Sequence, residues 1–228
     1  YVDMFFASSF QGAASGLAYG NFLIQAPVGI LSNSLILPLL TKFSKLKADK
    51  NYVKLGKNLT IGIEYCFLTT ILLTAFFITF NNQIVQLAFQ RGAFDLEAVN
   101  GVRKILIAYS IGIPAYLYRD LLVRTYYSIE KTKLPFKLSL LGILLNIFFD
   151  WTLIRFLAPY RLEIEGIILS SAVVNFIICC ILSINLKNNN LRLPFSFLFV
   201  KILLISLSAV ITAYTCFSIF QNVPQLNT

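Results

Sequence analysis

The sequence contains no histidine, few charged residues (13%) and a single methionine, which is at position 4 rather than position 1. The lack of histidine excludes a histidine general base and the common zinc sites that use imidazole ligands. The four cysteines form no Cys-X-X-Cys pair and lie in apolar runs, so we interpret them as buried thiols. We therefore expect no enzyme activity, no cofactor and no bound metal, and we expect the chain to be a piece of a longer protein.

Apolar residues, in contrast, are abundant. They make up 57% of the 228 residues, and the mean hydropathy is +0.76, whereas soluble domains average roughly 45–50% apolar residues. Six segments reach the length of about 20 residues that a bilayer requires, while residues 1–10 are too short to cross. The sequence predicts an all-α polytopic membrane protein with about six full transmembrane helices plus the end of a preceding one, the spans being 14–41, 59–80, 105–127, 136–157, 164–186 and 196–220.

The basic residues are distributed unevenly between alternate loops. Segment 42–57 alone carries six lysines. Counting onward through the predicted spans, twelve basic residues fall on that side and five on the other, which is the asymmetry that orients membrane proteins with the positive side inward. We expect segment 42–57 in the cytoplasm and segment 91–97 outside. The net charge of +9 is explained by orientation, so we expect no nucleic-acid partner.

The first full span carries small and polar residues at helical spacing. Gly12, Gly16 and Gly20 recur every four residues, so this face predicts close contact with another helix. Asn21 and Gln25 continue the same face one turn apart. Because an amide in hydrocarbon would lack hydrogen-bond partners, we expect both side chains to face protein or water.

Other interruptions of the apolar spans have structural interpretations. Pro27 and Pro38 are expected to bend or break the first span. Asn175, near the middle of the fifth span, is expected to form a hydrogen bond between helices. Asp150 is four residues beyond Asn146 and close in sequence to Arg155, and we interpret it as part of a solvated outer rim.

The third span carries the densest group of ionisable side chains. Tyr116, Asp120 and Arg124 share one face, and Arg119 lies at its edge. Such residues in a membrane helix are expected to face a bundle interior or a wet cavity, so we expect Arg124, held by Asp120, to face a cavity. Alternatively, the arginines extend to the headgroups while Asp120 pairs with Arg124. The candidate substrate-binding residues are Asn21, Gln25, Tyr116, Arg119, Asp120 and Arg124.

Three pieces of sequence, taken in order, carry a resemblance to a known family. They are FASSFQGAASGLAYGNFLIQAPVGI followed by LILPLL, then LAFQRGAF, then RTYYSIEKTKLP. They resemble the MurJ (MviN-type) lipid II flippases of the multidrug/oligosaccharidyl-lipid/polysaccharide exporter superfamily. In that family the corresponding pieces look like AS…G…YA-[ND]-R-L…P-x-G with a later LP, a piece ending RGxF, and an FYA…TKTP-like turn. The similarity covers essentially the whole chain.

The resemblance implies a fourteen-helix transporter with two six-helix lobes around a cationic cavity, followed by two extra helices. On that basis residues 1–186 would be the second lobe, from the end of helix seven to helix twelve, and residues 187–228 would contain an extra transmembrane helix, the final helix being absent. The implied function is movement of a lipid-linked anionic substrate, lipid II, across the inner (plasma) membrane by alternating access. The implied partners are that substrate, membrane lipids and the first lobe of the same protein.

The sequence departs from the family pattern at one position in the first full span. Phe22 follows Asn21 where the family usually has an arginine, so a cavity arginine expected to meet the diphosphate is absent. Arg119 or Arg124 would then have to compensate, or the substrate would be another lipid-linked glycan or a small molecule. A membrane-embedded glycosyl or phosphate transferase would require Glu64, Asp120 and Asp150 to act together. A purely structural membrane subunit is the remaining alternative.

Overall fold

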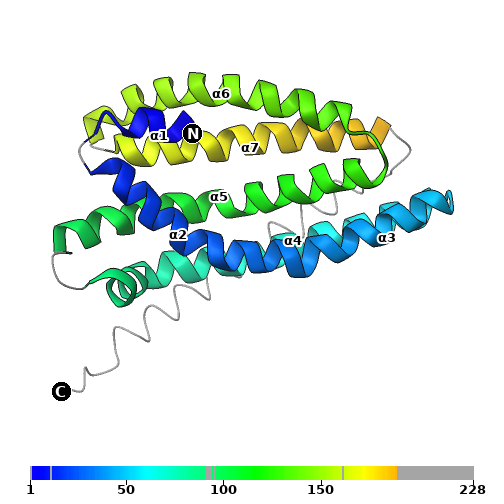
Figure 1. Cartoon of the computed structure of the whole chain (residues 1–228), viewed down its shortest axis with the longest axis horizontal. Helices are drawn as coiled ribbons and strands as arrows, with labels where there is room; N and C mark the ends of the chain where they lie inside the picture. The colour runs from blue at the N-terminus through cyan, green and yellow to red at the C-terminus, as the bar shows by residue number, and fades with distance from the viewer. Residues whose placement is uncertain (1, 11, 91–93, 95, 161, 189–228) are drawn as a thin grey trace, which may run out of the picture.

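Figure 1 shows the computed structural model of the chain, which describes residues 2–10, 12–90, 94, 96–160 and 162–188. These residues form helices and connecting turns, with no strand among them. Five helical segments are long and apolar enough to cross a membrane, which confirms the prediction of an all-α polytopic membrane protein; they are Ala13–Ala48, Tyr52–Phe89, Leu96–Ser128, Lys133–Tyr160 and Glu163–Leu186. The sixth predicted span, 196–220, lies outside the described residues.

The first span is interrupted near its middle. Helix α2 (Ala13–Leu31) leads into a π-helical turn, η1 (Ser32–Ile36), and then into α3 (Leu37–Ala48). Pro38 lies in the first turn of α3, and a proline there would leave the carbonyl of Ser34 without a donor in a regular α-helix. The wider π turn accommodates this loss. Pro27, in contrast, lies inside α2 without interrupting it.

The second span is longer than the sequence predicts. Helix α4 (Tyr52–Phe89) begins where the Asn51 side chain accepts a hydrogen bond from the Lys54 amide, at 3.1 Å. A kink at Phe80 (φ −104°, ψ 19°) coincides with the predicted end of the span, but the helix continues beyond it. The basic segment 42–57 was expected to be a loop and is instead mostly the ends of α3 and α4, joined by a short turn at residues 49–51.

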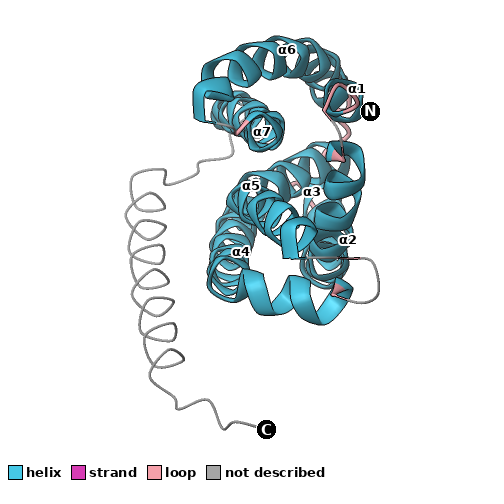
Figure 2. Cartoon of the chain, turned by 90° about the vertical axis from the view of Figure 1, so that its left-hand side faces the viewer, coloured by secondary structure: helices cyan, strands magenta, loops and turns pink. Residues whose placement is uncertain are grey.

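Helix α5 (Leu96–Ser128) is the centre of the bundle. It packs against α2 and α4 on one side and against α7 (Glu163–Asn188) on the other, while α6 (Lys133–Leu157) packs on α7. Figure 2 shows α6 and α7 as one group and α2 to α5 as the other. The short α1 (Val2–Ala7) contacts α6 and α7, and a 3₁₀ turn, η2 (Ala158–Tyr160), ends α6.

Two of the three glycines on the first span contact α5, as predicted. An added Cβ would lie 2.7 Å from Ile105 Cδ1 at Gly16 and 2.6 Å from Ile105 Cγ2 at Gly20. The prediction is wrong for Gly12, which precedes α2 with a left-handed backbone (φ 74°) and has open space around it. This glycine is explained by the turn it forms and not by helix packing.

The connections predicted to be cytoplasmic lie together at one end of the bundle. The end of α3 and the turn after α5 are joined by an ion pair between Lys47 Nζ and Glu130 Oε2, at 2.5 Å. The end of α4, the start of α5, the end of α6 and the start of α7 lie at the opposite end (Figure 1). The helices therefore alternate in direction, as the distribution of basic residues requires.

Candidate functional site

A cavity of about 230 Å³ lies between α2, α5 and α7, and we call it the α2–α5–α7 cavity. Four of the six candidate residues line it: Asn21 and Gln25 from α2, and Tyr116 and Arg119 from α5. Asn175, which the sequence assigned only to helix contact, lines it from α7. Residues separated by more than 150 positions are thus brought to one polar site within an apolar bundle.

Arg119 is the basic residue of this cavity. Its Nη1 donates a hydrogen bond to Asn175 Oδ1, at 2.8 Å, which confirms the predicted interhelical role of Asn175. Within the described part of the chain, Arg119 has no carboxylate partner and no second hydrogen bond. A guanidinium has five N–H donors, so most of its donors are available to an anion or a sugar hydroxyl.

The polar side chains on α2 are paired with each other. Gln25 Nε2 donates to Asn21 Oδ1 at 3.3 Å, a long contact at an exposed position. This hydrogen bond leaves the Gln25 carbonyl, one N–H of the Gln25 amide and both N–H groups of the Asn21 amide without a partner among the described residues. Tyr116, which is 43% exposed, adds a phenolic hydroxyl. The cavity therefore offers donors and acceptors around a single positive charge.

Asp120 and Arg124 form a separate site. Arg124 Nε donates to Asp120 Oδ1 at 2.9 Å, which confirms the predicted pair one turn apart. Ser32 Oγ, from the π turn, donates to Asp120 Oδ2 at 2.6 Å, and Arg124 Nη2 donates to Ser32 Oγ at 3.2 Å. Neither charged residue lines the α2–α5–α7 cavity.

In the described part of the chain, Arg119 rather than Arg124 therefore lines the α2–α5–α7 cavity. The physical reason lies in the partners on neighbouring helices: Ser32 of η1 hydrogen-bonds to both Asp120 and Arg124, whereas Arg119 hydrogen-bonds to Asn175 of α7. A pattern read within one span cannot reveal this contact between η1 and α5.

A second, more polar cavity of about 310 Å³ lies between α1, α6 and α7, with Arg119 at its border; we call it the α1–α6–α7 cavity. Asp3 is its acidic residue: Asn146 Nδ2 donates to Asp3 Oδ1 at 2.7 Å, and Ser171 Oγ donates to Asp3 Oδ2 at 2.9 Å. Sequence reasoning missed Asp3 and Ser171. The sequence did offer one signal for Asp3: it is the only charged residue in segment 1–10, whose other residues are apolar or uncharged.

The interpretation of Asp150 as a solvated outer residue is wrong. Its side chain is fully buried, and the Ser170 hydroxyl donates a hydrogen bond to one carboxylate oxygen. The other oxygen has no hydrogen-bond partner among the described residues. Asp150 was assigned to the outer rim because Arg155 is only five residues away in the sequence. In the structure, the Arg155 guanidinium instead lies over the Trp151 ring, 4.1 Å from its centroid.

The arrangement favours binding over bond-making chemistry. The described residues contain no group of three or more histidine, cysteine, aspartate or glutamate side chains that could hold a metal ion. Glu64, Asp120 and Asp150 were the carboxylates that a transferase would need, yet Asp120 is engaged by Arg124 and Ser32 while Asp150 is buried against Ser170. The Arg119 guanidinium, with a single hydrogen bond to the described residues and in a cavity also lined by the amides of Asn21, Gln25 and Asn175, suits recognition of an anionic group.

Comparison with known proteins agrees with this architecture. A sequence profile described as "Lipid II flippase MurJ" matches residues 1–224. A probable lipid II flippase MurJ of Synechocystis is 38% identical over 174 residues, which cover 76% of this chain and 32% of the relative. A lipid II flippase MurJ of Thermosipho africanus is 28% identical over 134 residues, covering 59% of this chain and 27% of the relative.

Similarity also extends to a solved structure, a lipid II flippase MurJ in an inward closed conformation. It has a TM-score of 0.79 and 25% identity and covers 99% of this chain and 45% of the solved chain. The chain spans about a third of the length of the curated relatives it matches. The family is one of flippases rather than of catalytic enzymes. By its sequence and its fold, the chain belongs to the lipid II flippase MurJ family.

Proposed function

We propose that this chain is the second lobe of a flippase that moves a polyprenyl-diphosphate-linked peptidoglycan precursor, lipid II, across the cytoplasmic membrane by alternating access. Residues 1–186 form the lobe, and residues 187–228 contribute an extra transmembrane helix. The first lobe of the same protein completes the transport cavity. The family supports this proposal, and the physical logic suits the substrate, because a diphosphate needs positive charge in a hydrated cavity while its tail can stay in lipid.

The observation that carries the proposal is the position of Arg119. Its guanidinium is half-buried, lines the α2–α5–α7 cavity and has one neutral hydrogen-bond partner, Asn175. An arginine without a carboxylate partner in a membrane helix is energetically costly unless it serves a ligand or water. Asn21, Gln25 and Tyr116 supply further polar groups for the headgroup. We propose that these four residues contact the substrate, whereas Asp120 and Arg124 hold the π turn against α5.

Phe22 supports a second candidate substrate. Its side chain is 70% exposed and does not line the α2–α5–α7 cavity, so the cation that the family pattern places after Asn21 is missing from α2. Arg119 then provides the positive charge of the cavity, and this charge is carried by α5 rather than by α2. A shifted charge suits lipid II bound in a different orientation, or another lipid-linked anionic glycan.

Complementation of a cell depleted of its lipid II flippase distinguishes these candidates. The full-length protein should restore growth, and Arg119→Ala should lose that activity while Arg119→Lys keeps part of it, because lysine retains the charge without the bidentate geometry. Arg103→Ala is the matched control, since Arg103 lies on the same helix and bonds to Asn81 and Asn100 instead. Expression must be equal for all variants. A wild-type protein that accumulates but does not complement would favour the other glycan.

A further inference from the structure

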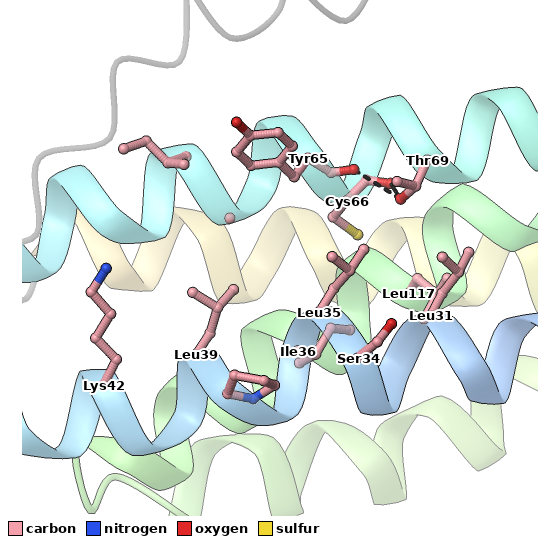
Figure 3. A pocket seen from close by; sticks show the side chains of 13 residues that line it. Leu31, Ser34, Leu35, Ile36, Leu39, Lys42, Tyr65, Cys66, Thr69 and Leu117 are labelled. Atoms are coloured by element: carbon pink, nitrogen blue, oxygen red, sulfur yellow. Dashed lines mark hydrogen bonds between the residues drawn. The ribbon is translucent and has the colours of Figure 1, made fainter.

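A groove on the outer surface of the bundle is separate from both polar cavities. It lies between α2–η1–α3 and α4, and its volume is about 340 Å³. Figure 3 shows the Leu35 and Leu39 side chains pointing across it toward α4, with Lys42 at one end and Leu31 and Leu117 at the other. We call it the α3–α4 groove. The π turn shapes it, because Ser34, Leu35 and Ile36 line the groove while Ser32 of the same turn faces Asp120.

The walls of the groove are hydrocarbon in character. Two of its three hydroxyl groups are bonded to their own helix: Ser34 Oγ donates to the Ile30 carbonyl at 2.7 Å, and Thr69 Oγ1 donates to the Tyr65 carbonyl at 2.8 Å; the third belongs to the exposed Tyr65 ring. Hydroxyls bonded to their own helix present mainly methylene and methyl surface to a neighbour. The groove is open to its surroundings, because Ser34 and Lys42 are exposed and Tyr65 is 58% exposed. An apolar chain is therefore the ligand that the walls suit.

Lys42 supplies a positive charge at the end of the groove nearer the predicted cytoplasmic turns. It lies six residues before the end of α3, roughly 9 Å along a helix axis. Within the described residues it has no ion-pair partner. The segment Ala13–Ala48 is 36 residues long, about 54 Å, which exceeds the ~30 Å hydrocarbon core. Lys42 therefore falls at the depth of the inner headgroups.

We propose that the α3–α4 groove binds one acyl chain of an anionic membrane phospholipid of the cytoplasmic leaflet, with the phosphate held by Lys42. The apolar walls select a hydrocarbon chain, and the unpaired lysine selects a negative headgroup. The volume is near the lower end of the roughly 300–1,000 Å³ usual for ligand pockets, which suits a single unbranched chain better than a bulky polyprenyl tail. The groove shares no lining residue with the α2–α5–α7 cavity, so the lipid and the substrate headgroup would occupy different sites.

Bound lipid would also stabilise the π turn. The chain would pack against Leu35 and Ile36 on one side of η1, while Ser32 holds Asp120 and Arg124 on the other. The lipid would thus act on the same turn that anchors α5, the helix that carries Arg119.

The experiment is a lipid titration of the detergent-purified full-length protein, followed by native mass spectrometry. Phosphatidylglycerol should bind more tightly than phosphatidylcholine as the first lipid. Lys42→Ala should weaken the first phosphatidylglycerol roughly five-fold, the factor that one basic residue contributes near an anionic surface, and should leave phosphatidylcholine unchanged. Lys137→Ala is the matched control, because Lys137 is exposed near the start of α6 and does not line the groove.

A second pair of variants tests the groove itself. Ser34→Phe fills it and should remove the first lipid of either kind, whereas Leu37→Phe, at an exposed position outside the groove, should not. Equal effects of Lys42→Ala and Lys137→Ala would contradict the proposal, as would unchanged binding in Ser34→Phe. Displacement of phosphatidylglycerol by a polyprenyl diphosphate, one for one, would overturn it by assigning the groove to the substrate's tail. Because the readout is lipid binding, these outcomes are separate from any failure of transport.

Discussion

The contact between α2 and α5 gives the sharpest test of the packing. Gly16 and Gly20 both face Ile105, but they meet different atoms of it: Cδ1 at 2.7 Å for Gly16 and Cγ2 at 2.6 Å for Gly20. A methyl group added at Gly20 would also lie 3.3 Å from the Tyr109 ring. Cδ1 is the free end of a flexible side chain, whereas Cγ2 is fixed close to the backbone by the branch at Cβ. The two alanine substitutions should therefore differ in severity.

The expected magnitudes follow from these contacts. Overpacking typically destabilises a core by about 1–3 kcal/mol, and Gly20→Ala should fall in that range because neither Cγ2 nor the Tyr109 ring can move away freely. Gly16→Ala should be milder, since rotation of Cδ1 relieves the clash. Gly29→Ala is the control: Gly29 lies in the same helix with nothing near an added Cβ, so this change should stabilise the helix by up to about 1 kcal/mol.

A double substitution makes the reasoning specific. Ile105→Val removes Cδ1 and keeps Cγ2, so it should rescue Gly16→Ala and leave Gly20→Ala as unstable as before. The assay is thermal unfolding of the purified full-length protein, with the midpoint temperature compared across the four single variants and the two doubles. If Gly16→Ala and Gly20→Ala unfolded at the same temperature as Gly29→Ala, the close approach of α2 to α5 would be refuted.

Three further predictions concern other parts of the chain. Arg124→Ala removes the hydrogen bonds to Asp120 and Ser32 and should lower the free energy of unfolding by about 1–3 kcal/mol while leaving substrate affinity unchanged in the folded fraction; loss of affinity without loss of thermal stability would contradict this. Lys50 is exposed and has a left-handed backbone, φ 52°. Lys50→Gly should therefore raise the unfolding midpoint by relieving up to about 1 kcal/mol of backbone strain. A lowered midpoint would show that the Lys50 side chain stabilises the fold by more than this strain costs. A cysteine replacing Lys47 in intact cells should be protected from an impermeant thiol reagent while one replacing Tyr160 reacts, and the opposite pattern would mean that the orientation is inverted.

Much of the fold could be predicted because its signal is local. The lengths of the apolar runs gave five spans that correspond to helices, and the small-residue spacing of Gly16 and Gly20 identified a real contact. The ends of the helices were less predictable. Polar, charged residues in segment 42–57 suggested a loop, yet they continue α3 and α4, because lysines on a helix outside the hydrocarbon core are solvated as readily as lysines in a loop.

The site was only partly predictable because it depends on contacts between distant segments. Asn21, Gln25, Tyr116 and Arg119 were identified from polar side chains in apolar spans and do meet in one cavity. The sequence could not show that Ser32 captures Asp120 and Arg124, because that contact depends on a π turn 88 residues away from Asp120. Asp150 was misplaced for the same reason, since its partner Ser170 is on another helix.

The central claim is that Arg119 supplies the positive charge that holds the anionic headgroup. It is tested most directly by the affinity of the purified full-length protein for a polyprenyl diphosphate, measured for wild type, Arg119→Lys, Arg119→Ala and Arg124→Ala. Loss of a hydrogen bond to a charged group is worth about 1.5–3 kcal/mol, so Arg119→Ala should weaken binding roughly ten-fold or more. Arg119→Lys should be intermediate, and Arg124→Ala should bind as wild type does. Wild-type affinity in Arg119→Ala, together with a loss in Arg124→Ala, would contradict the account.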